Sequence, residues 1–248
     1  MEEKIRLDKY LSDYTELTRS QAKKAIREGR VRVGETIAVK GDTKVATSDI
    51  VWLDGREIQG ERYQYIMLHK PAGVVSATVD KEDTTVVDLV YNTAGEAYLA
   101  KDLFPVGRLD KDTEGLILLS NDGMLAHRIL SPGRHVPKKY KVILDEDIDQ
   151  TAVELMEQGL DIGEKHLTKP AVLEQIGQRE YFLTITEGKF HQVKRMFAAL
   201  GRRVVYLKRV EMAGLTLDEK LAKGEWRFLT EEEIATLKQI GSGIEGVV

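Results

Sequence analysis

Apolar positions recur along the chain with two different periods, and these periods predict its helices and strands. Apolar residues return every three or four positions over Leu7–Tyr14 and again after Thr18, which is typical of helices that bury one face. Short alternating or continuous apolar runs predict strands, for example at residues 65–68, 116–119 and 181–186. Strands and helices follow one another without a repeating unit. We therefore expect an α+β fold with a mixed, mainly antiparallel sheet flanked by helices.

A polar stretch divides the chain into two parts. Residues 55–62 are rich in charged and polar side chains and predict a linker, and apolar density resumes at Tyr63. We expect a small domain over residues 1–60 and a larger domain over residues 61–241, followed by a C-terminal tail over residues 242–248.

The second helix carries a stripe of basic side chains. It opens with a Thr-x-x-Gln capping box at residue 18. Within it Arg19, Lys23 and Arg27 recur every four residues, and Arg30 extends the stripe beyond the helix. A charged stripe is usually a solvated helix face. This one has few acidic partners, which favours a surface that binds phosphates.

Composition narrows the class of protein. Of the 248 residues, 42% are hydrophobic and 31% are charged, which is an ordinary globular composition. There is no cysteine, so disulfides, a thiolate nucleophile and cysteine-ligated zinc are excluded. No apolar run approaches the roughly 20 residues that span a bilayer, the start lacks the pattern of a signal peptide, and the histidines have no metal-ligand spacing. We expect a cytoplasmic protein without a membrane partner or a metal site.

Charge is segregated along the chain, although the net charge is only −4. Residues 4–34 hold nine Lys or Arg against four acidic residues, residues 128–141 hold five against none, and residues 186–210 hold seven against one. Residues 145–164 hold eight carboxylates and no basic residue. Basic patches bind phosphates because each neutralised phosphate releases counterions. The segregation therefore predicts a nucleic-acid partner in spite of the net charge.

Three residues could carry chemistry together. Asp110 could be a nucleophile that forms a covalent adduct with an electrophilic carbon. Arg195 could favour its charged form, and Tyr140 could stack on a flipped base. Each has a simpler interpretation: Asp110 as a turn residue, Tyr140 as a half-buried strand residue, and Arg195 as a phosphate contact.

The N-terminal region resembles the S4 RNA-binding module. The likeness rests on the segments RLDKYL at residues 6–11, TRSQA at residues 18–22 and IREGRVRV at residues 26–33. It covers about residues 4–55. The resemblance implies a small helix–helix–strand fold that places the basic helix against structured RNA.

The rest of the chain resembles the RsuA-type pseudouridine synthases. The segments that carry this likeness are GRLDKDTEGL at residues 107–116, EGKFHQVKRM at residues 187–196, and the pairs Lys-Pro at residue 70 and Lys-Tyr at residue 139. They occur in family order with the S4-like region in front.

This resemblance implies a role for each site residue. Asp110 matches the essential aspartate, Tyr140 the tyrosine that stacks on the target uracil and is a proposed proton acceptor, and Arg195 the basic residue paired to the aspartate. Leu207 matches an apolar residue under the site. Arg108 matches the side chain that helps to fill the gap left by the flipped nucleotide.

The implied reaction is the isomerisation of a flipped-out uridine in RNA, which needs no cofactor. The resemblance leaves open whether Asp110 bonds to the sugar or the ring, or deprotonates the sugar. We expect a monomer that acts on ribosomal RNA. The segments LTKPA at residues 167–171 and FHQVKRMFAA at residues 190–199 favour the small subunit over the large one. We expect Lys138, Lys139 and Lys194 to contact the RNA together with the basic stripe.

Two further functions are weighed against this one. Residues 110–113 match loosely the Asp-x-Asp-x-Thr pattern of haloacid-dehalogenase-like phosphotransferases, one residue short. There an apolar strand precedes the first aspartate, whereas here it follows, which counts against that function. The other alternative is a non-catalytic RNA-binding protein whose basic patches are its whole function.

Overall fold

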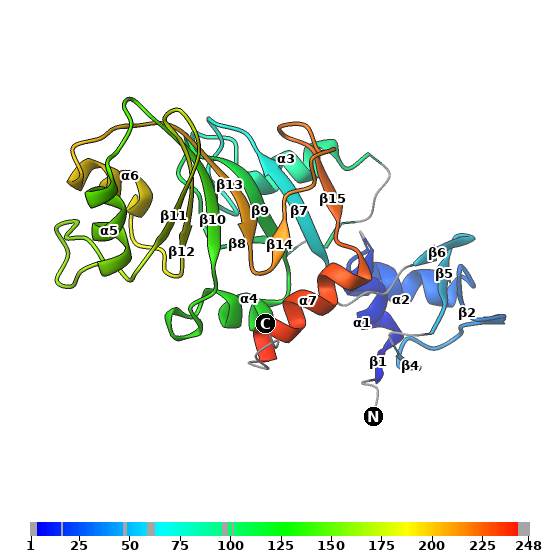
Figure 1. Cartoon of the computed structure of the whole chain (residues 1–248). Helices are drawn as coiled ribbons and strands as arrows, with labels where there is room; N and C mark the ends of the chain where they lie inside the picture. Colours follow the sequence, from blue (N-terminus) through cyan, green and yellow to red (C-terminus); the bar gives the residue numbers. More distant parts are fainter. Residues whose placement is uncertain are drawn as a thin grey trace. The chain divides into compact units, whose positions relative to one another are not determined.

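The computed structural model describes residues 4–15, 17–46, 49–58, 63–95, 99–100 and 102–242 (Figure 1). The chain divides into two compact units. The first unit comprises residues 1–64 and 94–102, and the second comprises residues 65–93 and 103–248. The expected α+β class is confirmed, with a mixed, mostly antiparallel sheet in the second unit.

The first unit packs two helices against short strands. Strand β1 (Lys4–Arg6) leads into α1 (Leu7–Tyr14), and α2 (Arg19–Arg27) follows. The other strands are β2 (Val31–Val33), β3 (Thr36–Ile37), β4 (Lys44–Ala46), β5 (Val51–Leu53) and β6 (Arg56–Ile58). Strand β1 pairs with β4, and the others form an antiparallel sheet in the order β3-β2-β5-β6.

Local sequence signals set both helices of this unit. The Thr18 hydroxyl accepts a bond from the Gln21 amide (3.3 Å), and the Gln21 side chain accepts one from the Thr18 amide (2.8 Å), which confirms the capping box. The apolar side chains of both helices form one buried core with those of the strands. The basic residues of α2 lie on the opposite, exposed side of that helix.

The predicted linker over residues 55–62 is wrong in part. Arg56–Ile58 forms strand β6, which pairs with β5. Its residues are polar because most of this edge strand is exposed, so no apolar alternation marks it. Residues 59–62 lie outside the described residues, and so do residues 243–248 of the predicted tail.

The second unit is built on a nine-stranded sheet, as far as the described residues show it. Its strands are β7 (Tyr65–Lys70), β8 (Phe104–Val106), β9 (Glu114–Ser120), β10 (Lys138–Leu144), β11 (Val172–Gly177), β12 (Glu180–Ile185), β13 (Val204–Met212), β14 (Leu215–Thr216) and β15 (Trp226–Phe228). The main order is β11-β12-β10-β13-β9-β7-β15, with β8 beside β9 and β14 beside β13. Strands β9 and β13 run parallel, and the other pairs are antiparallel.

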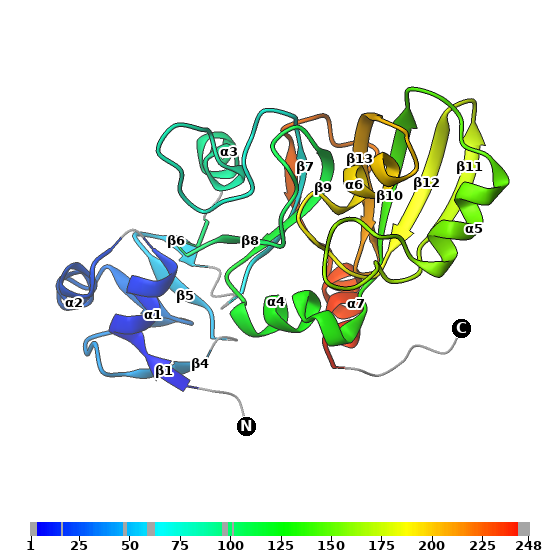
Figure 2. The same ribbon diagram turned by 90° about the vertical axis from the view of Figure 1, so that its left-hand side faces the viewer.

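Helices cover the sheet and its ends (Figures 1 and 2). They are α3 (Val86–Thr93), α4 (Gly123–Leu130), α5 (Gln150–Gln158), α6 (Gln192–Ala199) and α7 (Glu231–Ser242), with a 3-10 turn η1 at Pro132–Arg134. Helix α3 packs on β7 and β8, α5 on β11 and α6 on β13, while α4 packs on α7.

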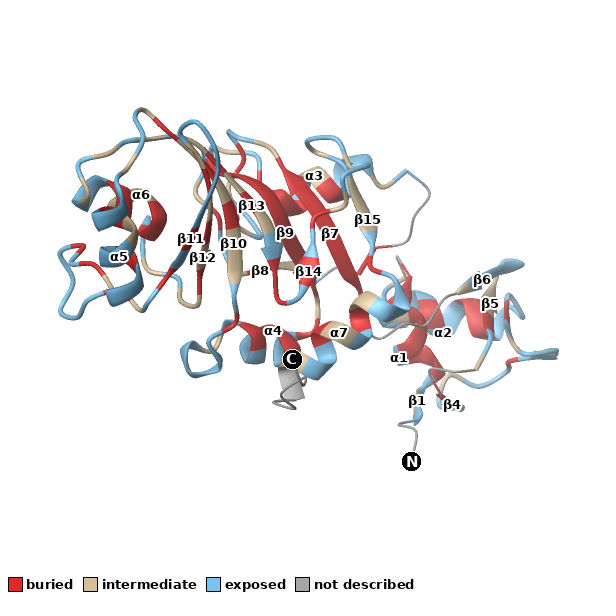
Figure 3. Cartoon of the chain, viewed as in Figure 1, coloured by how far each residue is buried: buried red, intermediate tan, exposed pale blue. Residues whose placement is uncertain are grey.

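The central strands β7 and β9 are buried along their whole length, as the red ribbons in Figure 3 show. A strand covered on both faces needs apolar residues at consecutive positions. This explains the continuous run Leu116–Leu119. The loop that precedes β9 therefore leads directly into a fully buried strand.

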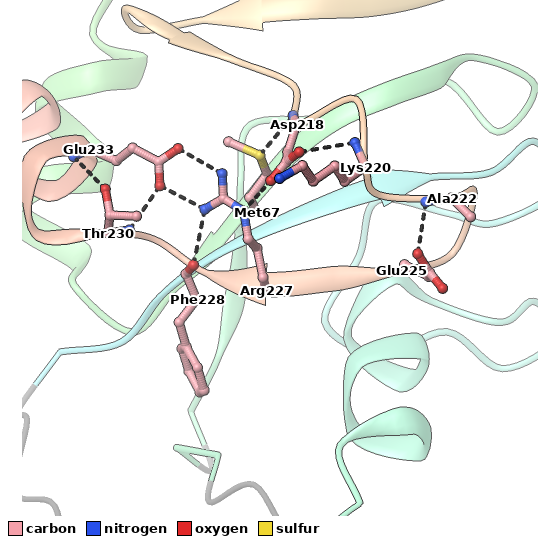
Figure 4. Close-up of polar contacts among 9 residues, drawn as sticks. All are labelled: Met67, Asp218, Lys220, Ala222, Glu225, Arg227, Phe228, Thr230 and Glu233. Atoms are coloured by element: carbon pink, nitrogen blue, oxygen red, sulfur yellow. Dashed lines mark hydrogen bonds and ion pairs between the residues drawn. The ribbon is translucent and has the colours of Figure 1, made fainter.

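A charged network holds the far edge of this sheet (Figure 4). Arg227 on β15 donates to Asp218 (2.7 Å) and to both carboxylate oxygens of Glu233 (2.7 and 2.9 Å). Glu233 also accepts from the Thr230 amide (2.8 Å), and its own amide donates to the Thr230 hydroxyl (3.3 Å), so the two residues form a capping box. One guanidinium thus ties the edge strand to the start of α7.

Candidate active site

The loop that carries Asp110 lies between two glycines in left-handed conformations. Gly107 has φ +84° and Gly115 has φ +107°, a region that side chains rarely adopt. A side chain at Gly115 would also collide with the backbone of Arg209. Glycine at this position therefore lets β9 approach β13 closely and brings the loop beside that strand.

Two buried side chains hold the backbone of this loop on either side of its carboxylate. The ammonium of Lys70 donates to the carbonyls of Lys111 (3.2 Å) and Thr113 (2.8 Å), and its side chain is fully buried. Burial lowers the pKa of Lys70 to about 8. The hydroxyl of Ser76 donates to the Leu109 carbonyl (2.9 Å) and accepts from the Leu109 amide (3.0 Å). The loop is thus fixed before any substrate binds.

Lys194 is the basic partner of Asp110. Its ammonium lies 3.0 Å from one Asp110 oxygen and 2.5 Å from Asp112, and the imidazole of His191 lies 3.7 Å from the other Asp110 oxygen. Burial lowers the pKa of Lys194, but its bonds and attraction to the two carboxylates outweigh burial and raise that pKa overall. Lys194 therefore stays charged, and the hydrogen bond that it donates is the main reason why the pKa of Asp112 is lowered.

The expectation that Arg195 pairs with Asp110 is wrong in this structure. The Arg195 guanidinium pairs with Glu164 (2.8 Å) and donates to the carbonyls of Phe190 (3.0 Å) and Ile162. Adjacent residues on a helix point about 100° apart. Lys194 therefore faces the Asp110 loop, while Arg195 faces the segments on the other side of α6.

The other three predicted site residues share one cleft with Asp110. The cleft has a volume of about 920 Å³. Tyr140 and Leu207 come from the neighbouring strands β10 and β13, line the cleft and are buried, at 7% exposure each. Arg108 also lines the cleft and is exposed. The cleft therefore combines the half-buried carboxylate of Asp110, the buried ring of Tyr140, the apolar side chain of Leu207 and the exposed guanidinium of Arg108.

The adjacent lysines of β10 point to opposite faces of the sheet, because side chains alternate along a strand. Lys138 shares the cleft with Tyr140, and burial lowers its pKa to about 8. Lys139 instead pairs with Glu174 (3.3 Å) and lies 4.7 Å from the ring of Phe182. The structure therefore does not bring Lys139 to the cleft.

The remaining predicted contacts belong to the first unit. Arg19, Lys23 and Arg27 are exposed on α2, and Lys23 lies 3.8 Å from the Asp8 carboxylate. Arg30 differs, because its guanidinium forms a bidentate pair with Asp54 (2.6 and 2.7 Å). Its charge is therefore largely used within the chain.

Ser76 and His191 were missed by sequence reasoning, and Lys70 and Lys194 received other roles. The pattern around Lys70 held a signal, since a charged residue that ends a fully apolar strand must find buried acceptors. Ser76 has no comparable signal. Its partner Leu109 lies 33 positions away in the sequence.

The described residues show neither a metal-binding cluster nor a membrane-spanning helix. No three His, Asp or Glu side chains there lie together as a metal ion would require. None of the helices in the described part of the chain is long and apolar enough to cross a membrane.

Comparison with known proteins assigns the chain to a protein family. The model of the family described as RNA pseudouridylate synthase matches residues 64–199, and the S4 domain model matches residues 5–51. The chain belongs to the RNA pseudouridylate synthase family. Ribosomal small subunit pseudouridine synthase A of Vibrio cholerae is 42% identical to this synthase over 94% of the chain and 99% of the relative.

Other relatives also align with this synthase over nearly its whole length. The protein of the same name from Escherichia coli K12 is 42% identical over 94% of the chain and all of the relative. An uncharacterized RNA pseudouridine synthase of Bacillus subtilis is 44% identical over 95% of the chain and 99% of the relative. A crystal structure of a pseudouridylate synthase matches with a TM-score of 0.65 and 41% identity, over 94% of the chain and 99% of that structure.

Family membership decides between the alternative functions. A pseudouridylate synthase is an isomerase, so the phosphotransferase alternative is wrong, and so is the alternative of a purely RNA-binding protein. The predicted S4-like region is confirmed as an S4 domain.

Proposed function

We propose that this synthase converts a uridine to pseudouridine in the ribosomal RNA of the small subunit, as a monomer in the cytoplasm. The names of the relatives from Vibrio cholerae and Escherichia coli, which align over nearly their whole length, support the choice of subunit. In this proposal residues 1–60 bind RNA, residues 61–241 carry out the reaction, and residues 242–248 form a tail.

The observation that carries the proposal is the Asp110 carboxylate, held by Lys194 in the same cleft as the buried ring of Tyr140. The target nucleotide flips out of its helix into this cleft, where Tyr140 stacks on the uracil. Asp110 attacks the flipped nucleotide as a nucleophile. The bond between N1 of uracil and C1′ of ribose breaks, the uracil turns, and C5 bonds to C1′. The bond to Asp110 breaks as well, and its electron pair returns to the carboxylate, which is thereby regenerated.

The last step moves one proton. The proton on C5 leaves, Tyr140 accepts it in our proposal, and N1 gains a proton in exchange. The product is an isomer of the substrate, so no co-substrate is consumed and no cofactor is assigned. Leu207 supports the uracil from below, and Arg108 occupies the space that the flipped nucleotide leaves.

Lys194 takes the role that the family resemblance gave to Arg195. A charged ammonium 3.0 Å from the carboxylate orients it and balances its charge in a partly buried site. Arg195 acts at a distance by holding the backbone beside His191. We propose it as a positioning residue and not as a catalytic one.

Basic side chains extend the binding surface beyond the cleft. Lys138 contributes a cation at the cleft itself. Arg19, Lys23 and Arg27 offer three cations on the exposed side of α2 for phosphates of the RNA. The bidentate pair with Asp54 leaves Arg30 a smaller part.

Mapping of pseudouridine in the ribosomal RNA tests the substrate. Cells that lack the gene should lose one modification in small-subunit RNA, and the purified protein should restore it in that RNA. Loss of a large-subunit modification instead would move the substrate to the other subunit. Unchanged maps of both RNAs would overturn the proposal.

A further inference from the structure

An aromatic ring stands out at the mouth of the cleft. The side chain of Phe190 lines the cleft and is 74% exposed. Tyr140, which lines the same cleft, is buried. A scattered exposed apolar side chain needs no explanation. An exposed aromatic ring on the rim of a reacting site is a candidate binding surface.

The ring of Phe190 is already stacked on one side. Its centroid lies 3.8 Å from that of the His191 ring, and the two planes differ by 19°. The same His191 lies 3.7 Å from Asp110. The two rings therefore form a stack: its inner ring, His191, lies beside the reacting carboxylate, and its outer ring, Phe190, is exposed.

Several bonds fix the segment that presents these rings. Arg195 donates to the carbonyl of Phe190 (3.0 Å), and the Gln192 side chain accepts from the amide of Lys189 (2.8 Å). The ammonium of Lys189 donates to two carbonyls, those of residues 166 and 167. His191 has φ +48°, a left-handed conformation that costs free energy and is retained mainly where the surroundings impose it. The exposure of Phe190 is thus built into the segment.

We propose that Phe190 and His191 form a stacking platform for an unpaired nucleobase next to the target uridine. The inference rests on the proposed reaction at Asp110. A nucleobase fits this surface because every base has a flat face that stacks on an aromatic ring, whatever its sequence. The target uracil takes the buried ring of Tyr140, so its neighbour in the chain meets the exposed ring on the rim.

The proposed platform explains why Arg195 contacts the segment of Phe190. The guanidinium bridges Glu164, Ile162 and Phe190 and does not contact Asp110. By holding the Phe190 carbonyl it sets the height of the platform above the loop of Asp110. Arg195 is therefore a positioning residue for the neighbouring base.

The test combines three protein variants with altered RNA. Phe190→Ala removes the outer ring, Phe190→Trp restores a larger one, and Phe228→Ala removes an exposed phenylalanine on β15 that does not line the cleft. The substrate is a synthetic RNA that spans the mapped uridine, alongside versions with one abasic nucleotide on its 5′ or its 3′ side. Turnover gives kcat and KM, and fluorescence anisotropy gives the Kd of each protein.

Phe190→Ala should raise KM and Kd roughly tenfold or more, with a much smaller change in kcat, and Phe190→Trp should recover most of the loss. One abasic RNA should weaken wild-type binding by a similar factor, and Phe190→Ala should lose nothing further with that RNA. Phe228→Ala should match the wild type.

Two results would overturn the platform. One is a Kd for Phe190→Ala equal to that of Phe228→Ala. The other is that, for both abasic RNAs, the loss of affinity caused by the missing base adds in full to the loss caused by Phe190→Ala, as it would if the base and the ring acted independently. Failure of the proposed reaction is distinguishable, because wild-type protein would then form no pseudouridine while the Kd values still compare the rings.

Discussion

Helices α2 and α6 are both short, amphipathic and basic, yet they use their cations in opposite ways. On α6, Lys194 and Arg195 reach carboxylates and carbonyls of the chain itself. On α2, Lys23 has 55% of its side chain exposed, compared with 28% for Lys194. The side chain of Arg27 makes no ion pair or hydrogen bond within the described residues.

The difference shows what decides the role of a basic residue. Helix α6 packs on β13 and faces the Asp110 loop, so its cations meet internal acceptors. Helix α2 presents its cations to solvent, where they remain available to phosphates. A cation that pairs within the chain is used by the fold, whereas a cation that faces solvent stays available to a partner.

The largest effect that tests this contrast is expected at Lys194. Lys194→Met leaves Asp110 without its ammonium, and loss of a donor to a reacting group lowers kcat roughly a hundredfold or more. Lys194→Arg should recover part of the rate. Arg195→Met should act mainly on KM, because Arg195 holds the segment of Phe190. Steady-state kcat and KM of the three variants check this, and a larger kcat loss for Arg195→Met than for Lys194→Met would reverse the assignment.

Lys70 extends the contrast to a cation that is fully enclosed. Its pKa is about 8 in the folded protein and near 10.5 when unfolded. As pH rises from about 8 to about 10.5, the folded state loses this proton first, so the unfolded state binds more protons and stability increases. The gain is roughly 3 kcal/mol at most.

Lys70→Met should remove that gain. Urea unfolding of wild type and variant at pH 7.5 and pH 10 measures the difference. The wild type should gain stability relative to the variant at the higher pH. Equal pH dependence in both proteins would show that Lys70 does not titrate in this window.

Charge reversal on α2 tests the outward cations. Lys23→Glu with Arg27→Glu should weaken RNA binding and reduce the slope of log K against log salt by about one to two. Catalysis at saturating RNA should persist. The control reverses Lys220 and Lys238, two exposed lysines of the second unit. Equal losses in both double variants would indicate a general charge effect and not a binding face.

The smallest effect separates two neighbours on β10. Lys138→Ala should weaken RNA binding several-fold, because Lys138 lines the cleft. Lys139→Ala should leave binding within about twofold, since Lys139 pairs with Glu174 on the other face. Equilibrium titration with the same RNA compares them, and the opposite order would place the RNA on the far side of the sheet.

Local patterns were sufficient for much of the fold. The capping box at Thr18 and the run Leu116–Leu119 predicted their elements correctly, because the signals lie within a few residues. Strand β6 was not predicted, because its residues are mostly exposed and polar. Strand β15 was not predicted either, because three residues at a sheet edge are too few to show an alternation of apolar and polar side chains.

The site was predictable by residue type but not by partner. The motif around Asp110 and the aromatic Tyr140 stood out in the sequence, and both line the cleft. The choice between Lys194 and Arg195 depends on which side of α6 faces a loop more than 80 positions earlier in the chain. No spacing within the helix contains that information.

The most direct test of the account is the replacement of Asp110 by asparagine, which keeps the shape and removes the charge. Pseudouridine formation is measured in the mapped RNA for Asp110→Asn and for the matched control Asp112→Asn, with RNA affinity measured in parallel. We expect no product from Asp110→Asn, unchanged RNA binding, and turnover within about tenfold of wild type for Asp112→Asn. Product formation by Asp110→Asn at the wild-type rate would contradict the account.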